Sequence, residues 1–450
     1  MDSRRKFEPT PHEPDDQLSK IRAAYLLGAG IVHSGEYMAM LVTTYLIFHK
    51  THSVLDTGLI LLCFNLPSVI LAGSATTISR RYGAARVDAW VNAAEGLWAL
   101  LPAALAGANH LNVLALFAWV LGYGVLEGLN APNSYLVRQL LAAPRRLPEL
   151  NSAYTRNVAM AAVFGLLVGG WIFVAVGPGW VFLVCALTAI PEVLVFFATA
   201  RVTASAHHVQ ASSESIGDAL TLLRSEPGLW AACRFAMLCF FVASYTVTLP
   251  AIAASINANA EILSILESGS LLGGILVALA VRRIHGRVRW SRVQRICYFG
   301  AGIGLAVMAI TEVLGGTHSH AADIAAFLVT IPIGFAILMN ASIVTSVIQI
   351  GTPREKRASM YTLLALIPLV VGPISQVLVG LLADHLSVSA ALGIVAGVTI
   401  VTNLVVSHRP MSQHFDNLDV LDAPFPVNEM GSQRGARRAR LHELHWPNPV

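Results

Sequence analysis

Long apolar runs, separated by short polar segments, dominate this chain. Twelve of these runs are close to the roughly 20 residues that a helix needs to cross a membrane. They cover residues 23–48, 57–79, 88–108, 112–140, 153–176, 179–200, 229–253, 259–281, 293–315, 321–349, 359–383 and 388–407. The pattern predicts an all-α membrane protein with twelve transmembrane helices in two six-helix bundles. A Gly-Pro-Gly at 177–179 predicts a tight turn between the fifth and sixth spans.

Polar segments divide the chain into five parts. We expect a cytoplasmic N-terminal tail at 1–22, a first six-helix bundle at 23–200, a cytoplasmic linker at 201–228, a second six-helix bundle at 229–408 and a disordered cytoplasmic tail at 409–450. Six spans, a longer linker and six more spans are the pattern of a duplicated transporter. Similar basic turns around Gly83 and Gly286 support this repeat.

The composition agrees with lipid as the main solvent of the chain. Hydrophobic residues make up 55% and charged residues only 12%, whereas a soluble domain averages about 25% charged residues. A net charge of +4 gives no indication of a nucleic-acid partner. The five cysteines form no C-x-x-C pair, so we interpret them as small buried hydrophobes. The expected partners are the lipid bilayer and a small-molecule substrate, with the chain as a monomer.

The basic residues predict the orientation in the membrane. Arg80, Arg81, Gly83 and Arg86 form a short turn between the second and third spans, which we expect to be the first cytoplasmic loop. With both termini inside, Lys50 is the only one of the 30 basic residues left for the outer face. We therefore expect a multi-pass protein of the plasma membrane with both termini in the cytoplasm.

Several stretches resemble the major facilitator superfamily, over about residues 20–408. They include Ser34-Gly35-Glu36 in the first span, Gly83 and Arg86 in the basic turn, 147–152 before the fifth span, 352–358 before the eleventh span and 380–384 at its end. Within the superfamily, the chain looks like the branch of drug and siderophore exporters that includes the enterobactin-exporter type. The resemblance implies the major facilitator fold and transport by alternating access. The family usually has an acid where this chain has Arg80, so its acid-to-base gating contact cannot form there.

Three of the acids within the apolar spans stand out. An ionisable side chain inside a span costs about 2.5–3.5 kcal/mol on insertion scales, so each one needs an explanation. Glu36 lies in the first predicted span, Glu95 in the third and Glu127 in the fourth. A buried carboxyl group can carry a proton through a transport cycle, so all three are candidates for proton coupling. The alternative is a structural carboxyl group that bonds to a neighbouring helix or, for Glu95, to an arginine such as Arg156 or Arg138.

A polar stripe runs along the fourth predicted span. Tyr123, Glu127, Asn130 and Ser134 recur at offsets of zero, four, seven and eleven, so they share one helix face. The resemblance implies that the first, fourth, seventh and tenth helices line the transport cavity. The candidates for contact with substrate in that cavity are Tyr123, Asn130 and Ser134 in the first half of the chain and Tyr245 and Asn340 in the second half. Polar packing between helices is the alternative explanation.

Motifs of energy-coupling and hydrolytic enzymes are absent from the sequence. It contains no phosphate-binding loop, no H-E-x-x-H and no G-x-S-x-G. We therefore expect no enzyme activity, no cofactor and no metal site, and an energy supply from an ion gradient or a separate subunit. The favoured hypothesis is a proton-coupled exporter of a small amphiphilic compound. The alternative is an importer or facilitator of a polar metabolite on the same fold, which would need more polar groups in the seventh and tenth spans.

Overall fold

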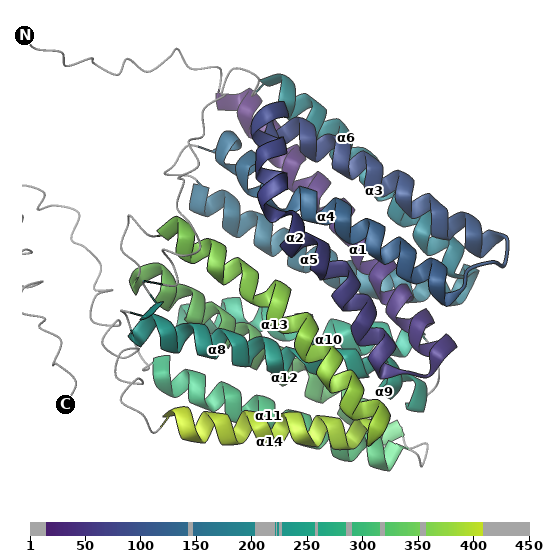
Figure 1. Ribbon diagram of the computed structural model, residues 1–450, viewed down its shortest axis with the longest axis vertical. Coiled ribbons are helices and arrows are strands. Elements are labelled where there is room, and N and C mark those ends of the chain that lie inside the picture. The colour runs from purple at the N-terminus through teal and green to yellow at the C-terminus, as the bar shows by residue number, and fades with distance from the viewer. Residues whose placement is uncertain are drawn as a thin grey trace, which may run out of the picture.

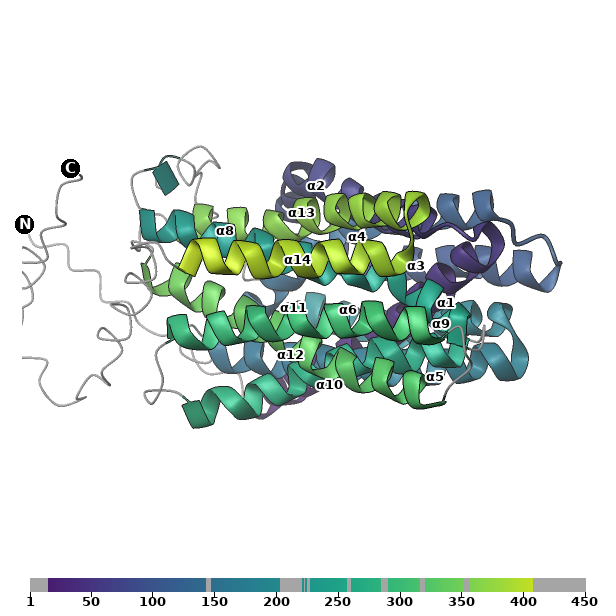
Figure 2. The same ribbon diagram turned by 90° about the horizontal axis from the view of Figure 1, so that it is seen from below.

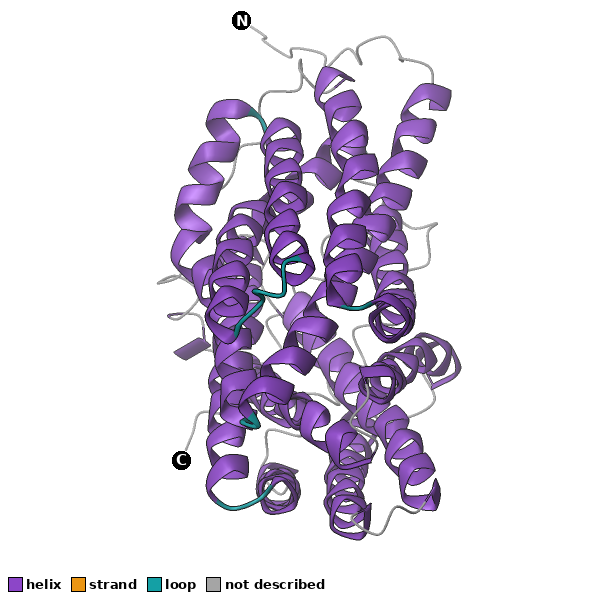
Figure 3. Ribbon diagram, turned by 90° about the vertical axis from the view of Figure 1, so that its right-hand side faces the viewer, coloured by secondary structure: helices purple, strands orange, loops and turns teal. Residues whose placement is uncertain are grey.

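The computed structural model describes residues 15–142, 147–202, 221, 223–224, 227–256, 260–284, 290–315, 320–351 and 357–407. Within these ranges the chain consists of helices and short turns (Figure 3). Most of the predicted tail 1–22, most of the linker 201–228 and the whole tail 409–450 lie outside the described residues. The boundaries and properties expected for those segments stay predictions.

Six helices form the first bundle. They are α1 (Asp15–Thr51), α2 (Val54–Tyr82), α3 (Ala84–Gly107), α4 (Val113–Leu141), α5 (Leu147–Val176) and α6 (Pro178–Val202). Ser53 caps α2 because its side chain accepts a hydrogen bond from the amide of Asp56. Gly83 and Gly177 follow α2 and α5 with φ angles of 87° and 91°, a left-handed conformation that glycine adopts most easily. The tight turn predicted at 177–179 is confirmed.

The second bundle has the same number of spans, and its first span is broken. The elements are α8 (Pro227–Ala243), the 3₁₀ helix η1 (Ser244–Thr248), α9 (Leu249–Ile256), α10 (Ala260–Ile284), α11 (Trp290–Gly315), α12 (His320–Gly351), α13 (Arg357–His385) and α14 (Val388–Ser407). Pro250 lacks an amide hydrogen and its ring disfavours α-helix in the turn before it. The residues just before Pro250 form the narrower 3₁₀ helix η1 in place of α-helix. We therefore treat α8, η1 and α9 as one interrupted span.

Most of the described helices are long and apolar enough to cross a membrane. Within the described residues, ten spans meet that condition by length and composition. The two remaining long helices are α1, which contains Glu36, and α3, which contains Asp88 and Glu95. The twelve helical spans predicted from the sequence are therefore present.

The two bundles lie side by side, with α1–α6 in the upper half of Figure 1 and α8–α14 in the lower half. Figure 2 shows the helices running lengthwise next to one another. Gly170 of α5 packs against Ser264 of α10, and Gly380 of α13 packs against the backbone of Leu55 in α2. These contacts lie near the α1–α2 turn, which is the end opposite the start of α1. The bundles are thus joined firmly at that end of the molecule.

Candidate functional site

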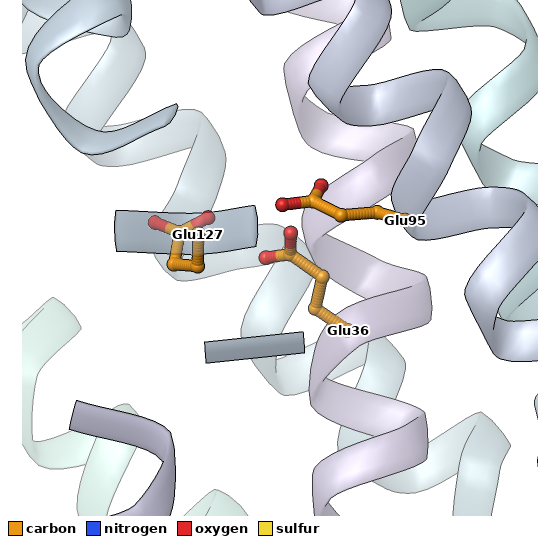
Figure 4. A group of neighbouring side chains, drawn as sticks. All are labelled: Glu36, Glu95 and Glu127. Atoms are coloured by element: carbon orange, nitrogen blue, oxygen red, sulfur yellow. The ribbon is translucent and has the colours of Figure 1, made fainter. Parts of the chain in front are cut away.

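Three glutamates from three helices bring their carboxyl groups together in the first bundle. Glu36 lies on α1, Glu95 on α3 and Glu127 on α4, and one oxygen of each lies within 4.8 Å of the others. Figure 4 shows the three side chains turned toward one another. The structure therefore gathers all three candidates for proton coupling into one group, which we call the glutamate cluster.

Tyr123 holds one member of the glutamate cluster in place. Its hydroxyl donates a hydrogen bond of 2.9 Å to Oε1 of Glu36. Tyr123 lies four residues before Glu127 on α4, so both side chains leave the same face of that helix. The tyrosine ring is 4% exposed and stacks on Phe64 of α2 at a centroid distance of 6.0 Å. This packing holds the Tyr123 hydroxyl within hydrogen-bond distance of the Glu36 carboxyl group.

Glu95 is the most buried member of the glutamate cluster. Its side chain is 2% exposed, and neither carboxyl oxygen has a hydrogen-bond partner among the described residues. Two like charges 4.8 Å apart repel by about 3.5 kcal/mol at an effective dielectric constant of about 20. Three ionised carboxylates at this spacing need a counter-charge, and a proton held within the cluster can supply it. The spacing of the oxygens would also admit a cation.

A small cavity opens beside the glutamate cluster. Glu36 and Glu127 form part of its wall, and its other polar wall residues are His33, Asp88, Asn92, Asn130, Tyr154 and Glu192. All of these residues belong to helices of the first bundle. The space open to the centre of a water molecule is about 30 Å³, and about 10–15 Å³ holds one water. The cavity therefore has room for about two waters.

Arg138 brings a buried positive charge close to this cavity. Its side chain is 3% exposed, and its Nε donates a hydrogen bond of 2.9 Å to Oδ1 of Asn151. A second donor, Nη1, lies 3.4 Å from the hydroxyl of Tyr25, and the guanidinium carbon lies 4.1 Å from the ring centroid of Tyr154. Arg138 also interacts electrostatically with Asp88. One cation thus offsets part of the negative charge of the cavity wall.

The substrate-cavity candidates do not form a single group. Tyr123 and Asn130 belong to the site in the first bundle, with Asn130 on the cavity wall. Ser134 lies within α4, but its side chain is outside the described residues. Tyr245 is fully buried in η1 and bonds to Ser270 of α10. Asn340 is fully buried in α12 and donates a hydrogen bond of 2.9 Å to the carbonyl of Ala336. The structure does not bring these last two residues to the glutamate cluster.

The basic turn joins α2 to α3 as the sequence indicated. Gly83 is the turn residue, and its amide donates a hydrogen bond of 2.9 Å to the carbonyl of Ser79. Arg81 and Arg86 are exposed, and the Arg81 guanidinium lies 5.4 Å from the ring centroid of Tyr82. The side chain of Arg80 is outside the described residues. The role of this turn in orientation therefore stays a prediction.

Three of the charged residues at the site were not among the candidates. Asp88 and Glu192 lie on the cavity wall, and Arg138 interacts with Asp88. A signal for Arg138 was present, because it continues the stripe of α4 at an offset of fifteen from Tyr123. Glu192 offered only an isolated acid in an apolar span, and no spacing along the chain connects it with the other helices.

An all-helical chain that crosses the membrane many times and buries ionisable groups in its core has the features of a membrane transporter. The family model described as "Major Facilitator Superfamily" matches residues 25–375. This match covers most of the 450 residues, so the chain belongs to the Major Facilitator Superfamily. It is a secondary transporter that works by alternating access, and family and fold indicate a transporter rather than an enzyme.

Solved structures of other transporters share this fold. A bacterial homologue of the iron transporter ferroportin, in an inward-facing state, has 14% identity and a TM-score of 0.67, with 87% of this chain and 99% of that chain covered. A nucleoside transporter has 12% identity and a TM-score of 0.65, with coverage of 88% and 99%. A POT peptide transporter has 12% identity and a TM-score of 0.66, with coverage of 89% and 95%. No curated protein matches the chain by sequence.

Proposed function

We propose that this chain is a proton-coupled exporter of a small amphiphilic compound, drug-like or siderophore-like. The observation that carries the proposal is the glutamate cluster, with three carboxyl oxygens within 4.8 Å. Such a group changes its charge by binding or releasing protons, and its burial in the first bundle couples that change to the surrounding helices. We place the protein in the plasma membrane as a monomer, with both termini in the cytoplasm.

Proton binding can be linked to alternating access through the first bundle. With a proton in the glutamate cluster, the repulsion between Glu36, Glu95 and Glu127 falls, and the bundle can pack around a less charged core. When that proton leaves, the charge returns and favours a conformation that gives the carboxyl groups access to water. A proton gradient across the membrane then drives the cycle in one direction.

The nature of the cargo is inferred from the second bundle. Its two candidates for contact with cargo are fully buried: Tyr245 bonds to Ser270 of α10, and Asn340 donates to the carbonyl of Ala336 in its own helix, with only its Oδ1 left without a partner among the described residues. A polar metabolite would need several free hydrogen-bonding groups that point into the transport path. Their scarcity among these candidates favours a cargo with a large apolar surface, in agreement with the resemblance to drug and siderophore exporters.

The test uses the full-length chain in proteoliposomes and in everted membrane vesicles. A growth screen of toxic compounds in an efflux-deficient host first identifies a cargo. Glu36→Gln and Glu127→Gln are then expected to abolish cargo movement driven by an imposed proton gradient, while both proteins insert and remain folded. Glu261→Gln changes an exposed acid at the start of α10 and serves as the matched control, with transport expected to stay normal.

Two outcomes would contradict the proposal. Full proton-driven transport in both glutamine variants would exclude the glutamate cluster as the coupling site. Transport driven by a sodium gradient and not by a proton gradient would identify sodium, instead of the proton, as the coupling ion. Everted vesicles also determine the direction, because an importer of a polar metabolite would move its cargo out of such vesicles.

A further inference from the structure

The polar stripe of α4 faces the interior of the first bundle and extends further than Ser134. Tyr123 bonds to Glu36, Glu127 belongs to the glutamate cluster, Asn130 lines the cavity, and the Arg138 guanidinium lies over the ring of Tyr154. From Tyr123 to Arg138 the helix rises by about 22 Å. Polar groups therefore follow one another along α4, from the glutamate cluster toward the α2–α3 turn.

Two further acids lie along this path. Asp88 is 1% exposed and Glu192 is 5% exposed, and both line the cavity with Glu36 and Glu127. Oδ2 of Asp88 and Oε2 of Glu192 have no hydrogen-bond partner among the described residues. A buried carboxyl oxygen without a partner is costly, so a water or a proton in the cavity is the natural partner for each.

The cavity can hold water between these acids and the glutamate cluster. It has room for about two waters by volume. A buried water makes about three hydrogen bonds, and Asp88, Asn130 and Glu192 each offer an oxygen that lacks a partner among the described residues. Glu36 and Glu127 complete the polar wall on the side of the cluster. Volume and polarity thus both fit a short chain of water molecules.

We propose that Asp88 and Glu192, with water in this cavity, carry protons between the glutamate cluster and the α2–α3 end of the first bundle. The inference rests on the proposed proton coupling and gives it a route. In each step one O–H bond breaks and another forms. A protonated Glu36 or Glu127 passes its proton to a water, and the resulting hydronium passes a proton to the carboxylate of Glu192 or Asp88. No electrons are transferred to or from the protein.

Asp88 is the acid of this route that lies closest to the α2–α3 turn. Asp88 lies about one turn from the start of α3 at Ala84, and the exposed Arg86 precedes it by two residues. With both termini in the cytoplasm, the α2–α3 turn lies on the cytoplasmic side. Protons that reach Asp88 would therefore be released to the cytoplasm, the direction in which a proton gradient drives an exporter.

Other ionisable and charged groups face this route from each helix around it. They are His33 and Tyr25 of α1, Arg138 of α4 and Tyr154 of α5. His33 contacts the carbonyl of Ala29 at 2.8 Å through Nδ1 and lies 3.4 Å from the Tyr154 hydroxyl through Nε2. The positive charge of Arg138 stabilises the ionised carboxylate of Asp88, so it favours release of a proton from Asp88.

A pH jump on the purified protein tests the route without a cargo. The full-length chain is placed in lipid nanodiscs, and its carboxyl groups are followed by time-resolved infrared spectroscopy. The band of the glutamate cluster is assigned as the signal that Glu95→Gln removes. In Glu192→Gln and Asp88→Asn, we expect that band to reach its full amplitude about 10- to 100-fold more slowly, because a positioned proton-transfer group has been lost.

Matched variants separate a relay from a structural role. Glu192→Asp and Asp88→Glu keep a carboxyl group and are expected to restore much of the rate, whereas Glu261→Gln is expected to leave it unchanged. Because Asp88 interacts with Arg138, Asp88→Asn is used only if it unfolds like the wild type. Glu192→Gln replaces a side chain of similar shape and carries the test by itself.

Unchanged protonation rates in Glu192→Gln and in folded Asp88→Asn would overturn the relay. That result would leave the proposed function standing if Glu36→Gln still abolished proton-driven transport. Conversely, slowed protonation in these variants, together with cargo transport that ignores the proton gradient, would support the relay as a proton path and reject proton-coupled export.

Discussion

Asp384 of α13 accepts a hydrogen bond of 2.6 Å through Oδ2 from the hydroxyl of Ser53, the residue that caps α2. The same carboxylate accepts hydrogen bonds from the amide of Val54 at 2.8 Å and from the amide of Leu55 at 3.2 Å. A carboxylate from the second bundle thus occupies the positive end of a helix in the first bundle. This contact joins the bundles at the α1–α2 end of the molecule.

Asp384→Asn is expected to weaken this junction. Because Asp384 is exposed, the lost charge–helix interaction is worth about 1 kcal/mol, which corresponds to about a fivefold shift toward the conformation open at this end. Spin labels at Lys50→Cys and Leu386→Cys, in a variant without native cysteines, would report the separation as a distance distribution. Asp56→Asn, in the first turn of α2, is the control. An unchanged distribution in Asp384→Asn would mean that packing alone holds the junction.

A second prediction for the same junction concerns the close packing of Gly380 in α13 against α2. A Cβ atom at Gly380 would lie 2.7 Å from Cα of Leu55 and 2.9 Å from the carbonyl oxygen of Val54. Gly380→Ala should therefore push α13 away from α2 and favour the open conformation in the spin-label measurement. Gly372→Ala is a matched control on the same helix, because a Cβ there has nothing within 4 Å among the described atoms. Similar behaviour of the two variants would contradict the close approach.

Tyr123→Phe removes only the hydroxyl that bonds to Glu36. The ring stack with Phe64 remains, so we expect a loss of about 1 kcal/mol in the free energy of unfolding and slower proton-driven cargo transport. Thermal unfolding in detergent and flux in proteoliposomes measure the two effects. Phe64→Leu, which removes the ring stack and keeps the hydroxyl, is the comparison. A flux equal to the wild type would show that Glu36 does not depend on this hydrogen bond.

Glu95→Gln should stabilise the protein in alkaline solution. The substitution removes one negative charge from a group whose oxygens lie within 4.8 Å, and the relief amounts to about 1–3 kcal/mol where the carboxyl groups are ionised. The stability difference between the variant and the wild type should shrink at acidic pH, because bound protons then offset the charge of the wild-type cluster. Unfolding temperatures of both proteins between about pH 5 and pH 9 test this. A variant that is less stable at every pH would contradict the repulsion.

The positions of the helices along the chain could be predicted from the sequence, but which helices pack against one another could not. The span predicted at 179–200 is α6 (Pro178–Val202), since spanning length and a Gly-Pro-Gly turn are local features. The first helix begins at Asp15, earlier than the predicted 23, because a helix can extend beyond the apolar core of the membrane. Such extensions carry polar residues, which a search for apolar runs excludes.

The same limit applies to the site. The spacing of Tyr123, Glu127 and Asn130 correctly placed them on one helix face, because that face depends only on the helical period. Which helices this face meets depends on packing between segments far apart in the chain. The structure turns it toward Glu36 and Glu95 inside the first bundle, and cargo contact by Tyr123 and Asn130 stays a prediction. Tyr245 and Asn340 were selected by helix number, which carries no information on burial.

The location of the acids within α1, α3, α4 and α6 has an evolutionary consequence. Glu36, Asp88, Glu95, Glu127 and Glu192 all belong to one half of a duplicated chain. If these five acids carry the proposed proton coupling, the half that contains α8–α14 can diverge in sequence without disturbing that coupling. Relatives that keep these five acids and differ in the second half would share a driving force and differ in their cargo. A chimera that joins this first half to the second half of such a relative is expected to transport the relative's cargo with the same ion dependence.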